Sequence, residues 1–184
     1  QWAGGLMSGG GTTKLAAGAD LTLSGNARKY LGNRTIENLG TLIEASTGDL
    51  VDFEGAAVLN NAGVFDIRSD TAWQNYTGAS GSLTLNNSGT LKKSAGAGDF
   101  FFLNTGLNNS GSVDVQSGIL AFGGGTGSSS GQFKAAAGSE VVFVAGTQTL
   151  TDGATASGAG ALAVRNLNGS TGGTLMVSGA VQAE

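Results

Sequence analysis

The chain has 184 residues and a formal net charge of −4, and it contains 34 glycines but no proline, cysteine or histidine. The missing residue types exclude a disulfide framework, the usual thiolate zinc sites and a Ser-His-Asp triad. Only 12% of the residues are charged, and Lys92-Lys93 is the one Lys-Lys pair, so no basic stripe for nucleic acid is present. No apolar run approaches the roughly 18 residues of a membrane-spanning helix, and we expect no membrane insertion.

Short extended segments, separated by glycine, serine, asparagine and threonine, follow one another along the chain. Ala-Asp-Leu-Thr-Leu at 19–23 is the first, and IENLGTLIE at 36–44 is the first copy of a motif that returns three times. The later copies are LNNAGVFDI at 59–67, LNNSGTLKK at 85–93 and LNNSGSVDV at 107–115. No window shows a helical period, so the chain is predicted to be all-β.

A second kind of extended segment lies between the copies of the motif. Its members begin with glycine and continue with a short, largely apolar run, at 48–53, 81–85, 98–103, 118–122 and 138–144. Two fainter copies of the motif carry the pattern toward the C-terminal end, at 128–136 and 157–165. Each unit therefore holds two or three short strands.

The spacing of the second asparagine in successive copies of the motif gives the length of the repeat. This asparagine recurs in steps of 23, 26 and 22 residues, at Asn38, Asn61, Asn87 and Asn109. A strand-only repeat of this length predicts a solenoid, because propeller blades need about 40 residues and the leucine-rich spacing is absent. We predict a single domain over 1–184, a right-handed parallel β-helix (β-solenoid) with about 22–26 residues per coil and roughly eight coils. It would be a section of a longer rod or a unit that stacks on its own copies.

Alternation along each copy places the second asparagine and the following glycine on the same parity as the apolar residues. In the second copy, Leu59, Asn61, Gly63 and Phe65 share this parity. A buried amide is costly unless it is hydrogen-bonded, and stacked coils let each asparagine donate to its counterpart one coil away. The predicted structural ladder comprises Asn38, Asn61, Asn87 and Asn109, with Gly40, Gly63, Gly89 and Gly111 at bends that a Cβ would oppose.

The segment 68–81 accounts for the one repeat of 26 residues, and its aromatic residues lie among polar neighbours. Insertions on a rigid scaffold are frequent binding sites. The candidate ligand-binding residues, suited to stacking on a sugar ring, are Trp73, Tyr76, Asp70, Gln74 and Asn75. The competing interpretation is that Trp73 folds back over a coil as a packing feature.

Acidic residues are the other candidates for chemistry, because parallel β-helices can carry carboxylates that cleave polysaccharides. Asp66 and Asp114 occupy the same phase of the repeat, but Lys92 occupies it on the coil between them. This pattern indicates charge alternation along one face. We therefore predict no catalytic residue, no metal site and no cofactor.

The repeated L-x-N-x-G pattern, followed by AAAGSEVVFVAGTQTL at 135–150 and SGAGALAV at 157–164, resembles bacterial secreted repeat proteins. These are the β-helical passenger regions of autotransporters and the stalks of filamentous-haemagglutinin-like adhesins. The resemblance implies export, and a location that is extracellular or at the bacterial cell surface.

Together these observations predict a non-catalytic extracellular scaffold, structural or adhesive. Its partners would be neighbouring coils of a parent chain, or other copies stacked end to end into filaments. A carbohydrate-binding module that contacts an extracellular glycan through 68–81 is the first alternative. A polysaccharide lyase or hydrolase on the same fold is the second.

Overall fold

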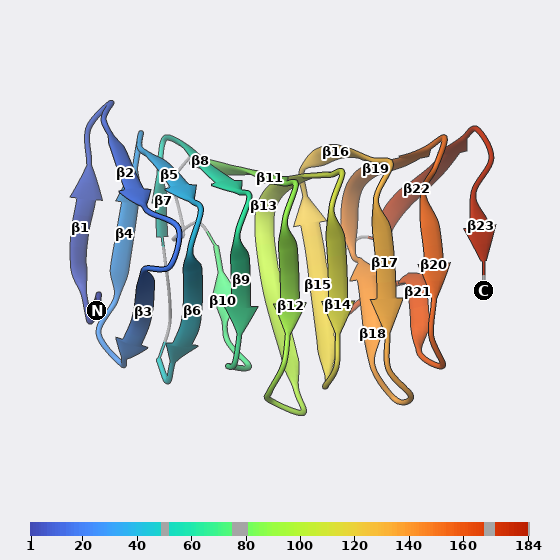
Figure 1. Cartoon of the computed structure of the whole chain (residues 1–184), viewed down its shortest axis with the longest axis horizontal. Helices are drawn as coiled ribbons and strands as arrows, with labels where there is room; N and C mark the ends of the chain where they lie inside the picture. The colour runs from blue at the N-terminus through green and yellow to red at the C-terminus, as the bar shows by residue number, and fades with distance from the viewer. Residues whose placement is uncertain (49–51, 75–80, 168–171, 184) are drawn as a thin grey trace.

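The chain forms a parallel β-solenoid of about seven turns, with about 23 residues per coil (Figure 1). The computed structural model describes residues 1–48, 52–74, 81–167 and 172–183. Every strand pair within these ranges is parallel, and none of the described residues is helical. The described ranges accordingly contain no helix that could cross a membrane. The predicted parallel β-helix is confirmed.

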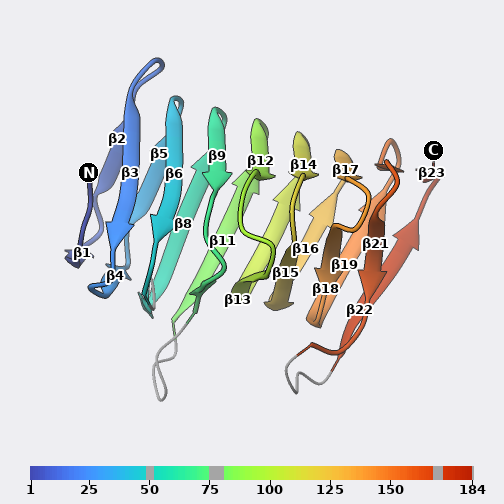
Figure 2. The same ribbon diagram turned by 90° about the horizontal axis from the view of Figure 1, so that it is seen from below.

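The strands of the described residues fall into three sheets that run along the solenoid axis. The N-terminal sheet has three strands: β1 (Gly5–Ser8), β4 (Lys29–Gly32) and β7 (Asp52–Glu54). The eight-stranded sheet contains β3 (Asp20–Gly25), β6 (Thr41–Ser46), β9 (Val64–Ile67), β12 (Thr90–Lys93), β14 (Ser112–Val115), β17 (Gln132–Ala135), β20 (Thr155–Ser157) and β23 (Gln182–Ala183). Figure 2 shows β9, β12, β14 and β17 side by side in chain order.

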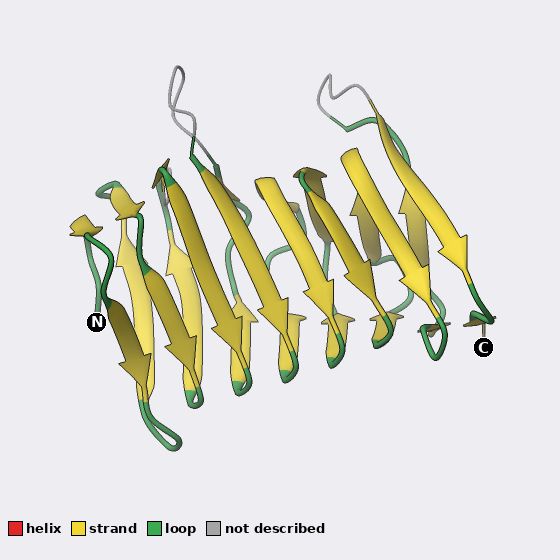
Figure 3. Ribbon diagram, turned by 90° about the horizontal axis from the view of Figure 1, so that it is seen from above, coloured by secondary structure: helices red, strands yellow, loops and turns green. Residues whose placement is uncertain are grey.

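The third sheet has twelve strands and contains two walls of the solenoid. Its main path is β2 (Thr12–Leu15), β5 (Thr35–Asn38), β8 (Ala56–Asn61), β11 (Ser82–Asn87), β13 (Asp99–Asn109), β15 (Ile119–Gly124), β18 (Glu140–Phe143) and β21 (Ala161–Val164). Four strands lie off this path: β10 (Ala72–Trp73), β16 (Thr126–Ser129), β19 (Ala145–Thr151) and β22 (Gly172–Ser178). Figure 3 shows how the strands of successive coils lie next to one another.

Strand β13 joins these two walls because it turns from one to the other without a break. Its first half pairs with β10 and β15, and its second half pairs with β11 and β16. The register shifts between Leu103 and Thr105, where Asn104 adopts a φ of 51°. Asparagine is one of the few residues that tolerates this left-handed conformation, so it suits the bend.

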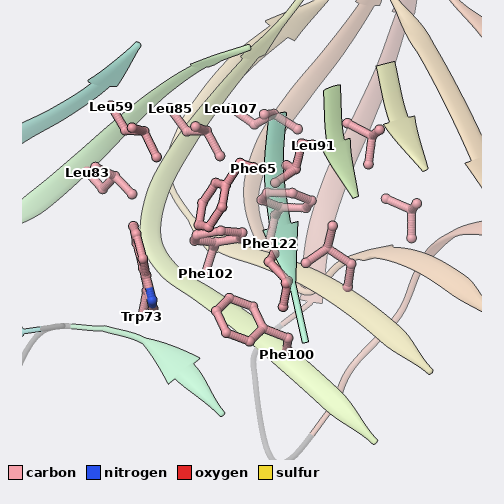
Figure 4. Packing of buried hydrophobic residues seen from close by; sticks show 14 of the residues in the cluster. Leu59, Phe65, Trp73, Leu83, Leu85, Leu91, Phe100, Phe102, Leu107 and Phe122 are labelled. Carbon is pink, nitrogen blue, oxygen red and sulfur yellow. The ribbon is translucent and has the colours of Figure 1, made fainter. Parts of the chain in front are cut away.

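The core fills the interior of the coils, because alternate residues of every wall point inward. Leu85 aligns with Leu59 on one side and with Leu107 on the other, and all three are at most 1% exposed. Burying a side chain of this size contributes about 1.5–3 kcal/mol. Aromatic rings also pack in the interior, where Phe102 stacks on Phe122 with ring centroids 5.3 Å apart (Figure 4).

The alignment of strands from coil to coil extends through nearly the whole chain, so the number of turns can be counted along one row of aligned residues. One row of aligned residues runs along the corner between the wall of β8 and β11 and the wall of β9 and β12. This row consists of Leu15, Asn38, Asn61, Asn87, Asn109, Ser129, Leu150 and Val177. Eight positions enclose seven turns, so the solenoid has about one turn fewer than the sequence suggested.

Candidate functional site

The insertion at 68–81 places its tryptophan in the core. Trp73 is 1% exposed, and its ring centroid lies 5.1 Å from that of Phe65 and 5.6 Å from that of Phe102 (Figure 4). Its indole Nε1 donates to Glu44 Oε2 at 2.9 Å. An indole in this position has no free face for a sugar ring, so the proposed ligand contact by Trp73 is wrong. Its large apolar area is worth more in the core than at the surface.

Of the other candidate residues of the insertion, the structure describes Asp70 and Gln74. Asp70 accepts hydrogen bonds from the buried Lys93 amine at 2.7 Å and from the backbone N–H of Gly98 at 3.0 Å. It therefore holds the turn of the next coil. Gln74 is half-buried beside the core. Asn75 and Tyr76 lie outside the described residues.

Two buried ionisable residues, Lys29 and Glu44, were missed by the sequence reasoning. Lys29 and Glu44 both have side chains with no exposure, and Glu44 Oε1 accepts from the Ser46 backbone N–H at 2.7 Å. Burial lowers the pKa of the Lys29 amine, and the Glu44 carboxylate opposes part of this shift. The sequence did contain a signal that Glu44 faces inward. Glu44 follows the inward Leu42 by two positions, and residues two apart in a strand point to the same side. Glu44 anchors Trp73 through the indole hydrogen bond.

The four motif asparagines form one continuous row of side-chain hydrogen bonds inside the solenoid. The Nδ2 group of Asn38 donates to Asn61 Oδ1 at 2.7 Å, Asn61 donates to Asn87 at 2.7 Å, and Asn87 donates to Asn109 at 2.8 Å. The first three amides also donate to a carbonyl oxygen of the following coil, on Val64, Thr90 and Ser112. Asn109 Nδ2 donates to the carbonyl of Gln132 at 3.2 Å. We call this row the inner ladder.

The glycine two residues after each inner asparagine is required by close packing between coils. A Cβ at Gly63, Gly89 or Gly111 would lie 2.2 Å from the carbonyl oxygen of the corresponding glycine one coil earlier. None of these glycines has a positive φ. The motif glycine is therefore needed for close approach of two backbones, and an unusual backbone conformation is not the reason.

A second row of asparagines faces outward at the same corner. Asn108 Nδ2 donates to Asn86 Oδ1 at 2.9 Å, and Asn86 Nδ2 donates to Asn60 Oδ1 at 2.8 Å. The backbone N–H of Ser128 donates to Asn108 Oδ1 at 3.3 Å. These bonds run toward the N-terminal end, opposite in direction to those of the inner ladder. We call Asn60, Asn86 and Asn108 the outer row.

The outer row forms one bank of an open trough along the corner. The opposite bank is a row of small exposed residues, Ala62, Ser88, Ser110 and Ser130. The trough has a volume of about 560 Å³, and the inner asparagines contribute to its floor. No ionisable side chain lines it. The sequence analysis identified the corner but not the trough, because a hollow depends on the angle between two walls.

The predicted charge alternation lies on the neighbouring wall. Lys92 aligns with Asp66 and with Asp114, and its Nζ lies 3.5 Å from Asp66 Oδ2. Asp66 is 1% exposed and also accepts from Arg68 Nε at 2.8 Å and from Ser94 Oγ at 2.5 Å. Within the described residues, no three acidic side chains come together as a metal site. The contacts of Asp66 with Lys92 and Ser94 tie neighbouring coils together.

Comparisons of this chain with protein-family models, with curated proteins and with solved structures found no significant match. The trough and the two asparagine rows are therefore interpreted from their own geometry.

Proposed function

We propose that this chain is a stiff, non-catalytic scaffold segment of an extracellular or surface-exposed bacterial protein. The single observation that carries the proposal is the inner ladder, in which buried polar side chains bond from coil to coil. The side-chain amides of the inner ladder therefore hold successive coils together along the solenoid axis. The resemblance of the repeat to secreted bacterial stalks supports the extracellular setting.

Stiffness is expected because the coils are held together along the axis by up to three kinds of contact, all three of which occur between Asn38 and Asn109. Parallel backbone ladders join successive strands on every wall. The inner ladder adds buried amide hydrogen bonds, and aligned apolar side chains pack between coils. Bending the rod would open all three kinds of contact on one side, and leaving a buried amide unpaired costs about 1–3 kcal/mol.

The last coil offers a surface on which the stack could continue. Val177 belongs to the inward row but is 60% exposed, and the adjacent Met176 is 52% exposed. Strand β22 pairs with β19 and with no other described strand. Further coils of a parent chain or the first coil of a second copy would cover this edge, and the second arrangement produces head-to-tail filaments.

Particle length and association test the proposal. Seven turns at about 4.8 Å predict a rod of about 34 Å, which small-angle scattering measures. End-to-end association predicts that sedimentation coefficients rise with protein concentration. Val177→Asp should abolish the rise, whereas Thr84→Asp, on an exposed mid-rod position, should not. A scattering profile typical of a flexible chain would overturn the scaffold proposal. A sedimentation coefficient that stays at the monomer value at every protein concentration would overturn the filament proposal.

A further inference from the structure

We propose that the trough at the asparagine corner binds an extended, neutral polysaccharide that lies parallel to the solenoid axis. The outer row would contact one edge of the glycan, and Ser88, Ser110 and Ser130 would contact the other. This inference does not depend on the scaffold proposal, because a rod of any role can carry such a trough.

The outer row has hydrogen-bonding capacity that the fold does not use. A primary amide offers two N–H donors and two acceptor lone pairs. Asn86 donates one N–H to Asn60 and accepts one bond from Asn108, which leaves one donor and one acceptor. Asn108 has the same balance, since it donates to Asn86 and accepts from Ser128. The coils of Asn86 and Asn108 therefore each present a free donor and a free acceptor, and a sugar hydroxyl can satisfy both.

The charge distribution favours a neutral ligand. The outward residues that flank the outer row are uncharged: Val58, Thr84, Gly106 and Thr126. The residues beyond the opposite bank are uncharged as well: Val64, Thr90, Ser112 and Gln132. An anionic polysaccharide would lose hydration of its charges here without gaining an ionic partner. The first charged residues in line with the outer row are Glu37 and Lys14, which pair with each other at 3.6 Å.

The spacing of the coils disfavours an extended peptide. Successive asparagines of the outer row are separated by the strand spacing, about 4.8 Å. One edge of an extended peptide repeats its backbone groups every two residues, about 6.7 Å. A peptide in the trough would therefore fall out of step after one coil. A glycan carries several hydroxyls on every ring and can meet each coil.

The trough is also organised before a ligand arrives. The bonds of the outer row hold the side chains of Asn60, Asn86 and Asn108 in one orientation. Ordering a flexible side chain on binding costs conformational entropy, and here folding has already supplied that order. Weak contacts repeated over successive coils would then add up along a polymer.

The experiment combines binding with two variants that change the trough in different ways. Neutral β-linked glucose and N-acetylglucosamine oligosaccharides are titrated into the folded protein, with an anionic polysaccharide and an unstructured peptide as competing probes. Asn86→Ala removes the central amide, and Ser110→Leu fills the trough while leaving the outer row intact. Gln116→Ala, an exposed position on the neighbouring wall, is the matched control.

We expect neutral glycans to bind, with longer oligosaccharides binding more tightly. Affinity should fall at least tenfold in both Asn86→Ala and Ser110→Leu and change less than twofold in Gln116→Ala. Circular dichroism establishes that each variant is folded. No binding of neutral glycans, binding unchanged by Ser110→Leu, or preference for the anionic or peptide probe would overturn the proposal. Rod length measured by scattering is the separate readout for the scaffold.

Discussion

Asn61 and Asn87 lie 26 residues apart in the chain, yet their buried side-chain amides are joined by a hydrogen bond of 2.7 Å. The bond links two consecutive coils at one corner, and the same arrangement joins Asn38 to Asn61 and Asn87 to Asn109. Each asparagine is at most 2% exposed. The repeated motif of the sequence is thus a repeated contact between coils.

Replacing the central member of the inner ladder should destabilise the whole rod. Asn87→Ala removes the acceptor of Asn61 Nδ2 and the donor to Asn109 Oδ1. Two buried polar groups are left short of a partner, and we expect the free energy of unfolding to fall by about 3 kcal/mol. Chemical denaturation measures this change. Asn108→Ala, in the exposed outer row, is the control and should change it by less than about 1 kcal/mol; equal effects would contradict the distinction between the rows.

The glycine of the same motif should not accept a methyl group. In Gly89→Ala the new Cβ would lie 2.2 Å from the Gly63 carbonyl oxygen, so the coils must separate. We expect a loss of about 3 kcal/mol, since overpacking of this kind displaces the backbone. A Cβ at Gly10 meets nothing within 4 Å, so Gly10→Ala should leave the thermal unfolding midpoint nearly unchanged. A tolerated Gly89→Ala would show that the coils approach less closely.

Trp73 is expected to stabilise the core and to play no direct part in glycan binding. Trp73→Phe keeps a ring against Phe65 and Phe102 but removes the donor to the buried Glu44 carboxylate. The loss should be about 2 kcal/mol, and about 4 kcal/mol for Trp73→Ala. Denaturation gives these values, and the same titrations used for the trough should show unchanged glycan affinity in folded Trp73→Phe. Selective loss of glycan affinity would restore the contact interpretation.

Removal of the charge should destabilise the protein much more at Lys93 than at the adjacent Lys92. Lys93 is fully buried, and its amine donates to Asp70 and to the carbonyls of Ala95 and Gly96. Lys93→Met leaves these acceptors without their donor, so we expect a loss of about 3 kcal/mol. Lys92 has a side chain that is 30% exposed and makes one longer ion pair, so Lys92→Met should cost less than about 1 kcal/mol. Urea unfolding compares the two, and a reversed order would refute this assignment.

The periodic features of the fold could be predicted from residues close together in the sequence. Alternation assigned Leu59, Asn61 and Phe65 to the interior, and the steps between asparagines gave the length of a coil. The failures lie where the repeat is interrupted. Trp73 lies outside the repeated asparagine motif, and only the pairing of β10 with β13 shows that it aligns with Phe102 and turns inward to Glu44.

By itself, the amino-acid sequence determined the all-β architecture, the coil length and the residues that face inward, because these depend on local alternation and on a repeat. Only the tertiary structure decided the burial of Trp73, the burial of Lys29 and Glu44 and the trough along Asn60, Asn86 and Asn108. These features depend on distances between coils and on angles between walls. Such quantities exist only once segments more than 20 residues apart have come together.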